Sequence, residues 1–328
     1  MGAATWLWVL SAPASVYLDD APPPMRRWEL GRLTAVAPLM VEQGRLLVVD
    51  LIEREQPSCR HLRVRWQDRF WPTHRAGEAL RAWMPVQLES PIGPAPLWVE
   101  CDGVKRRIEV QIQDIVPKLS RHKPRGRPGR AALRVLRRFG EPPLDRVRRE
   151  SLAIGRAFAN ASRERLWTEQ FLRPAAGVDT SAFGAVRTFR GRRSVHEGLD
   201  IAGGATDAVY AANDGRVILV ADDYFFIGNA VVIDHGEGLL TLYLHLETSV
   251  VRQDQMVKRG EPLGTIGNTG RVTGPHLHFA VRYRGRYVDP NDVLRFDPAR
   301  PLPDALAAEF LTPDRLIPDA KPYLSKND

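Results

Sequence analysis

The 328-residue sequence contains no apolar run that approaches the roughly 20 residues needed to cross a membrane as a helix. We therefore expect no stable membrane span. Cysteine is also scarce, with only Cys59 and Cys101. Neither lies beside a histidine or a second cysteine at the spacing of a zinc site, so we assign neither to a metal. The two could pair as a disulfide in an exported protein, or they could be small buried side chains.

Acidic residues are outnumbered, with 39 Asp and Glu against 47 Lys and Arg, and the formal net charge is +8. A basic surface favours anionic partners such as nucleic acid, anionic lipid or an acidic cell-wall polymer, although a solvated surface explains the excess equally well. The arginines between Arg134 and Arg149 are the densest group. They have no interleaved aromatic residues and no known reader motif, so we expect no nucleic-acid partner.

The first residues have the pattern of a secretory signal. Ala3 to Leu10 is apolar, and the alanines of Ser11 to Ala14 have the spacing of an A-x-A cleavage site. The run is short, however, and no Lys or Arg precedes it. We expect residues 1–20 to be a signal segment, and the alternative is a first strand.

Short strand-like segments with turn signals between them recur over residues 21–116. His61–Trp66, for example, alternates polar and apolar side chains. This spacing is typical of a small β-sandwich, and it contains no catalytic pattern. The other expected strands are 45–52, 83–88, 97–101 and 107–112.

Residues 117–130 are basic and rich in Pro and Gly, which is typical of a linker. Leucines then recur at helical spacing from residue 130 to about 171, interrupted by Pro142 and Pro143. We expect a solvated connector helix here.

Strand-like segments and glycine turns return after residue 171 and predict a mostly antiparallel β domain of about 125 residues. The expected fold is therefore mainly β, with a β-sandwich domain (21–116), a basic linker and helix (117–170), a C-terminal β domain (171–297) and a C-terminal tail (298–328). Gln255 to Gly264 also has the strand and turn pattern of a lipoyl-like carrier. No lysine stands at a hairpin tip as a carrier requires, so we attribute this to shared sheet geometry.

Gly274 to Val281 predicts a strand, because polar and apolar residues alternate after a Gly-Pro turn. Alternation places His276 and His278 on one face and apolar side chains on the other. Two imidazoles on one face suit half of a metal site. By itself, a His-x-His pair also describes an ordinary polar strand face.

Two further motifs favour the metal site. In His196-Glu197-Gly198-Leu199-Asp200, the glycine argues against a regular helix, so we expect Asp200 at the start of a strand and His196 on the loop before it. In Leu240 to Leu246, alternation places Tyr243 and His245 on one face and the leucines on the other.

Four of the eight histidines fall in these three motifs. A catalytic zinc typically has three protein ligands and an open position for water. His196, Asp200 and His278 supply a suitable set, which leaves His245 and His276 for acid–base work or for stabilising charge in the transition state. We expect His235, in an Asp-His-Gly turn, to be structural.

The three motifs resemble those of the lysostaphin-type zinc peptidases, which are bacterial peptidoglycan endopeptidases. The H-x-x-x-D element matches His196 to Asp200, the Tyr-x-His element matches Tyr243 to His245, and the H-x-H element matches His276 to His278. The resemblance covers roughly residues 171–292, and no motif position is replaced. It implies that His196, Asp200 and His278 bind Zn²⁺ and that His245 and His276 are the catalytic pair.

The family also implies a substrate, namely peptide bonds of the cell-wall stem or its cross-links, and an exported location in the periplasm or cell envelope. The N-terminal sandwich resembles, more loosely, the β-domain that precedes the peptidase domain in some exported members. We expect a monomer. The alternative function is a non-catalytic module that activates another cell-wall hydrolase, because some relatives have lost their ligands.

Overall fold

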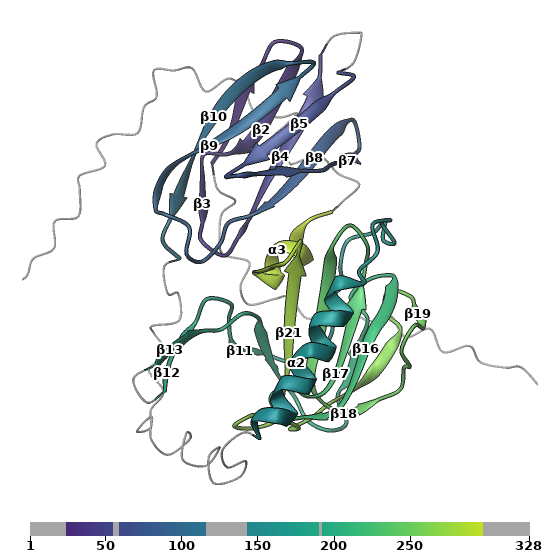
Figure 1. The fold of residues 1–328 in the computed structure, drawn as a ribbon. Helices are drawn as coiled ribbons and strands as arrows, with labels where there is room; N and C mark the ends of the chain where they lie inside the picture. The colour runs from purple at the N-terminus through teal and green to yellow at the C-terminus, as the bar shows by residue number, and fades with distance from the viewer. Residues whose placement is uncertain (1–23, 55–58, 116–142, 190–191, 298–328) are drawn as a thin grey trace, which may run out of the picture.

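The computed structural model describes residues 24–54, 59–115, 143–189 and 192–297, and this part of the chain is mostly β (Figure 1). The candidate signal segment 1–20, the whole linker 117–130, the first part of the expected helix up to residue 142 and the tail 298–328 lie outside the described residues. Within the described part, no helix has the length and apolar character that a membrane crossing requires.

The N-terminal region contains two five-stranded sheets, with strand orders β1-β2-β4-β8-β7 and β3-β10-β9-β5-β6. Their apolar side chains belong to one core, which includes Leu47 of one sheet and Trp66 of the other. The predicted β-sandwich is confirmed. The strands are β1 Met25–Glu29, β2 Leu33–Pro38, β3 Met40–Glu42, β4 Leu46–Glu53, β5 Leu62–Trp66, β6 Arg69–Trp71, β7 Thr73–Ala76, β8 Ala79–Pro85, β9 Gly93–Cys101 and β10 Val104–Gln113.

A disulfide joins the two cysteines of this region, with Cα atoms 5.5 Å apart. Cys101 ends β9, and Cys59 lies in the segment between β4 and β5. Of the two alternatives left open by the sequence, the structure contains the pair.

The C-terminal region is built on one large sheet with the order β11-β14-β21-β18-β17-β16-β19, and β15, β20 and β22 pair at its sides. All of the strand pairs in this sheet are antiparallel, as the sequence predicted. The strands are β11 Asp179–Ser181, β14 Leu199–Ala202, β15 Ala208–Tyr210, β16 Gly215–Tyr224, β17 Gly228–Asp234, β18 Leu239–Ser249, β19 Met256–Val257, β20 Pro262–Ile266, β21 His276–Tyr283 and β22 Arg286–Val288, with a separate hairpin of β12 Val186–Phe189 and β13 Arg192–Val195.

The helical prediction holds for part of its range. Helix α2 spans Leu144–Ala159, and the chain from residue 160 to 171 is not helical. Pro143 is the N-cap residue, since its fixed φ and missing N–H suit a helix start better than an interior. Asp145 in the first turn and Arg156 in the last complement the helix dipole.

Helix α2 is not the solvated connector that the sequence suggested. Ala157 is buried, and Ile154 and Phe158 pack against a cluster that includes Leu242 and Leu244 of β18. The helix therefore covers part of one face of the large sheet (Figure 1).

The sandwich contacts the C-terminal region through a second helix, α3, which spans Pro290–Arg295. Arg45 lies 2.7 Å from the Asp292 carboxylate and 3.4 Å from that of Asp289. The Leu46 backbone N–H donates to Asp292 over 2.7 Å. Trp83 of β8 stacks on Trp167, with ring centroids 5.3 Å apart.

Candidate metal centre

Two of the three predicted ligands lie on neighbouring strands, and the third lies on a loop beside them. β14 pairs with β21 so that Asp200 is directly opposite His278, and cross-strand partners share a face. His196 lies on the short loop between β13 and β14, as the sequence predicted, and its side chain is buried. The fold therefore brings together residues that are 82 positions apart in the chain.

The donor atoms of these residues converge. His196 Nε2 is 2.9 Å from Asp200 Oδ1 and 3.0 Å from His278 Nδ1, and His278 Nδ1 is 2.8 Å from the same Asp200 oxygen. A tetrahedral zinc with bonds of about 2.0–2.1 Å keeps its ligand atoms about 3.3 Å apart. The set is thus slightly tighter than a zinc shell, and a small outward movement of each donor would fit the ion.

Hydrogen bonds at the far side of the His196 ring favour metal binding. His196 Nδ1 is 2.8 Å from the carbonyl oxygen of Ala182, which can only accept, so Nδ1 carries the proton. In the neutral ring, Nε2 then presents a bare lone pair toward Asp200 and His278. A second partner that fixes the tautomer in this way is the usual support of a metal-binding histidine.

His245 and His276 lie beside this set. Their ring centroids are 5.1 Å apart, and His276 Nε2 is 3.7 Å from Asp200 Oδ1. Each donates Nδ1–H to a backbone carbonyl, His245 to Thr269 over 3.0 Å and His276 to Gly274 over 2.8 Å. In the neutral rings, both Nε2 atoms are therefore free to accept a proton.

Strict alternation did not place His245 correctly. Tyr243 packs in the core on one side of the sheet, whereas Leu240, Leu242 and Leu244 lie in the cluster under α2. His245 has a positive φ of 66°, and the pairing of β18 with β17 shifts register there. This bulge turns His245 away from the Tyr243 face, which it would share in a regular strand, toward His276 and His278.

Burial and neighbouring charges perturb the carboxyl and imidazole groups. Burial raises the pKa of Asp200, but the adjacent His196 and His278 rings, which can donate to the carboxylate once they are protonated, outweigh it and hold that pKa well below the usual range. Burial lowers the pKa of His278. Burial, followed by the neighbouring His276 and His278, lowers the pKa of His245 to about 3, so its ring is neutral near pH 7.

His235 is a structural histidine, as predicted. It is fully buried, with Nδ1 2.7 Å from the Asp214 carbonyl oxygen and Nε2 2.7 Å from the Thr241 hydroxyl. Both ring nitrogens are thereby occupied within the core.

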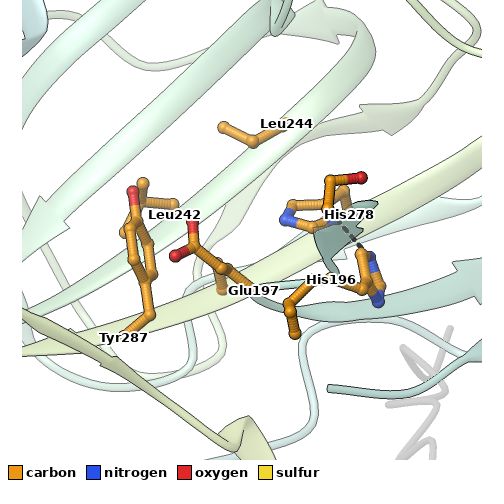
Figure 2. Close-up of a pocket in the computed structure, with 9 residues that line it drawn as sticks. His196, Glu197, Leu242, Leu244, His278 and Tyr287 are labelled. Atoms are coloured by element: carbon orange, nitrogen blue, oxygen red, sulfur yellow. Dashed lines mark hydrogen bonds between the residues drawn. The ribbon is translucent and has the colours of Figure 1, made fainter. Parts of the chain in front are cut away.

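A cavity of about 270 Å³ adjoins the His196–His278 pair (Figure 2). Its lining includes Glu197 and Tyr287, to which the sequence assigned no role. Glu197 is next to the predicted ligand His196 in the sequence, and this was the one feature that could have indicated it. Tyr287 comes from β22, and no feature of the sequence indicated it. Burial raises the pKa of Glu197, and burial followed by the Glu197 charge raises the pKa of Tyr287. The other lining residues are Ser194, Val195, Leu242, Leu244 and Ala280.

The sequence pattern of Peptidase family M23 matches residues 194–290, the segment that contains every residue of the centre. The chain contains a peptidase M23 domain. This is the lysostaphin-type family that the three motifs indicated.

Two curated relatives each match about a third of the chain. Peptidoglycan DD-endopeptidase ShyA of Vibrio cholerae serotype O1 is 45% identical over 98 residues, which are 30% of this chain and 23% of that protein. Murein hydrolase activator NlpD of Escherichia coli (strain K12) is 37% identical over 115 residues, which are 35% of this chain and 29% of that protein. The chain thus spans only about a quarter of the length of these relatives.

A solved structure extends the likeness beyond the M23 domain. The putative peptidase M23 from Pseudomonas aeruginosa matches with a TM-score of 0.55 and 27% identity, covering 77% of this chain and 94% of that one. The 77% of the chain that matches is much larger than the part formed by residues 194–290. The similarity of fold therefore also includes regions outside the M23 domain.

Proposed function

We propose that this protein is a zinc-dependent peptidoglycan endopeptidase that hydrolyses peptide bonds of the cell-wall stem or its cross-links. The observation that carries the proposal is the convergence of His196 Nε2, Asp200 Oδ1 and His278 Nδ1, with separations of 2.8–3.0 Å. Two imidazoles and a carboxylate in a largely buried position are a donor set typical of catalytic zinc. The endopeptidase named among the relatives supports the choice of substrate.

The side chains of the centre have separate tasks in this proposal. His196, Asp200 and His278 hold the zinc, which when bound would acidify water and polarise the scissile carbonyl. His245 and His276 each present an unprotonated Nε2 to the same space. One can take the proton of the attacking water, and either, once protonated, can stabilise negative charge on the carbonyl oxygen or protonate the leaving amine.

Two alanine variants test these roles. We expect the wild-type protein to contain one zinc per chain and to release peptides from purified sacculi. His196→Ala should lose both zinc and hydrolysis. His276→Ala should keep its zinc and lose turnover by a factor of about 100 or more, since it removes acid–base catalysis without removing a ligand. Zinc loss in His276→Ala together with zinc retention in His196→Ala would refute the ligand assignment.

The second candidate is a non-catalytic activator of another cell-wall hydrolase, and the activator named among the relatives favours it. The complete set of five side chains argues for the enzyme. The same sacculus digestion separates the two. Release only after a partner hydrolase is added would support the activator, and release by the purified protein alone would support the peptidase.

We also propose that the protein is exported to the cell envelope. The Cys59–Cys101 disulfide supports this location, because disulfides persist in oxidising compartments and are rare in the cytosol. Alkylation of intact cells before lysis should leave both cysteines unmodified in the mass spectrum of the protein. Full alkylation of both without added reductant would count against export.

A further inference from the structure

The cavity beside the metal centre contains one acidic and one phenolic side chain over an apolar floor. Leu242 and Leu244 of β18 and Ala280 of β21 form that floor. Figure 2 shows the Glu197 carboxyl group between Tyr287 on one side and the His196–His278 pair on the other. The polar groups therefore face the same hollow, directly beside the atoms that would hold the metal.

The Glu197 carboxyl group has no internal partner in the described part of the chain, where no hydrogen bond or ion pair engages it. Among the cationic groups, Arg282 has the strongest effect on Glu197 and lowers its pKa. Arg282 lies over the ring of Phe158 on α2, with its guanidinium carbon 4.5 Å from the ring centroid. Glu89, from the loop between β8 and β9, adds a second negative charge near Glu197.

We propose that this cavity is a specificity subsite for a substrate residue with an aliphatic stem and a terminal ammonium group. The inference rests on the proposed peptidase function. The stem would lie on Leu242, Leu244 and Ala280, and the ammonium group would donate to the Glu197 carboxylate and the Tyr287 hydroxyl oxygen. A volume of about 270 Å³ lies below the roughly 300–1,000 Å³ of ordinary ligand pockets, so the cavity suits one side chain.

The competing occupant is an uncharged aliphatic side chain, which the apolar floor would also accept. The Glu197 carboxylate is exposed in the free protein, and such an occupant would strip its hydration without supplying a partner, which costs binding energy. An ammonium group supplies that partner through charge-assisted hydrogen bonds, which are the stronger kind. The lining therefore favours the cation.

The test compares cross-linked muropeptides whose free amino groups are intact with the same muropeptides after acetylation, which removes the charge and keeps the stem. We expect the wild-type enzyme to hydrolyse the intact set with a kcat/KM at least about tenfold higher. Glu197→Gln should hydrolyse both sets equally, at a rate close to that of wild type on the acetylated set. Equal wild-type rates on the two sets, or an undiminished preference in Glu197→Gln, would overturn the proposal.

Three controls make the comparison specific. Asp68→Asn removes an exposed carboxylate in the turn between β5 and β6 and should behave as wild type. The zinc content of Glu197→Gln should equal that of wild type, which shows that His196 is undisturbed. If that variant loses its zinc or fails to fold, Tyr287→Phe decides: a reduced preference supports the subsite, and an unchanged preference overturns it.

Failure of the proposed function gives a different result. If the wild-type protein hydrolyses neither set, it is not the peptidase proposed above, and binding of the two sets by calorimetry tests the cavity directly. A preference of about tenfold for the intact set that disappears in Glu197→Gln supports the subsite. Equal binding of both sets overturns it.

Discussion

At the scale of single residues, packing requires a glycine at Gly198, the middle position of His196-Glu197-Gly198-Leu199-Asp200. A Cβ atom at Gly198 would lie 2.6 Å from His278 Nε2 and 2.8 Å from the Phe279 carbonyl oxygen. Both distances are too short for non-bonded contact, and the carbonyl belongs to the backbone of β21 and cannot rotate away. A side chain here would therefore displace the His278 ring from its position opposite Asp200.

Gly198→Ala should accordingly weaken zinc binding by about tenfold or more, a loss comparable to removing an outer-shell support. The measurement is zinc affinity by competition with a chelator. Gly204→Ala is the matched control, because a Cβ there meets no atom within 4 Å. Equal zinc affinity in the two variants would show that the ring of His278 tolerates the displacement.

At the scale of secondary-structure elements, β18 shows where sequence patterns succeed and where they fail. The alternation in Leu240 to Leu246 correctly predicted a strand with two distinct faces. It could not predict the bulge at His245, whose backbone N–H donates to the Ile227 carbonyl over 3.0 Å. That bulge depends on pairing with the end of the β16–β17 hairpin, a long-range contact that leaves no mark on local hydrophobicity.

The candidate site likewise has one part that local sequence patterns predicted and one part that they did not. Period-two alternation placed His276 and His278 on one face of β21, because both lie within a single regular strand. The approach of Asp200 to His278 depends on the register of β14 against β21, which local alternation does not encode. The family resemblance supplied that pairing. Nothing comparable indicated Tyr287, which enters the cavity from a strand without any motif.

Helix α2 is the element whose role was least visible in the sequence. Its arginines suggested a solvated connector, but the side chains of Ile154 and Phe158 pack on the face of the sheet that also holds His278. Phe158 in turn holds Arg282 by a cation–π contact. Helix α2 therefore borders the sheet face on which a substrate would bind. Because the helix belongs to the segment that precedes the M23 domain, that segment contacts this face.

At the scale of the whole molecule, aromatic packing joins the sandwich to the C-terminal region. Trp83 of β8 stacks on Trp167, Trp167 meets Phe171 edge-on at 5.1 Å, and Phe171 meets His235 at 5.0 Å. His74 of β7 lies edge-on to Trp83 at 5.3 Å and is 8% exposed. The contact therefore depends on a histidine that is enclosed by rings.

This environment requires His74 to stay neutral. Burial, together with the charges of Arg165 and Arg81, lowers its pKa to about 3. Neither ring nitrogen has a hydrogen-bond partner among the described residues. The unfolded chain has the ordinary pKa of about 6.5, so between pH 6.5 and 3 only the unfolded state binds the proton. The contribution of His74 to stability is therefore complete above pH 6.5 and decreases as the pH falls through this window.

His74→Phe should keep the edge-to-face ring contact and remove this pH dependence. From pH 7 to pH 5, wild type should lose up to about 2 kcal/mol more of its free energy of unfolding than the variant, from about 1.4 kcal/mol per proton and pH unit. The measurement is chemical denaturation at both pH values.

His235 and His245, with pKa values lowered to about 4 and 3, change the free energy of unfolding of both proteins equally, as does any change in zinc binding. His61→Phe, at an exposed position, is the control and should retain the wild-type difference. If His74→Phe lost as much stability as wild type between the two pH values, the interface would not be the acid-sensitive part of the molecule.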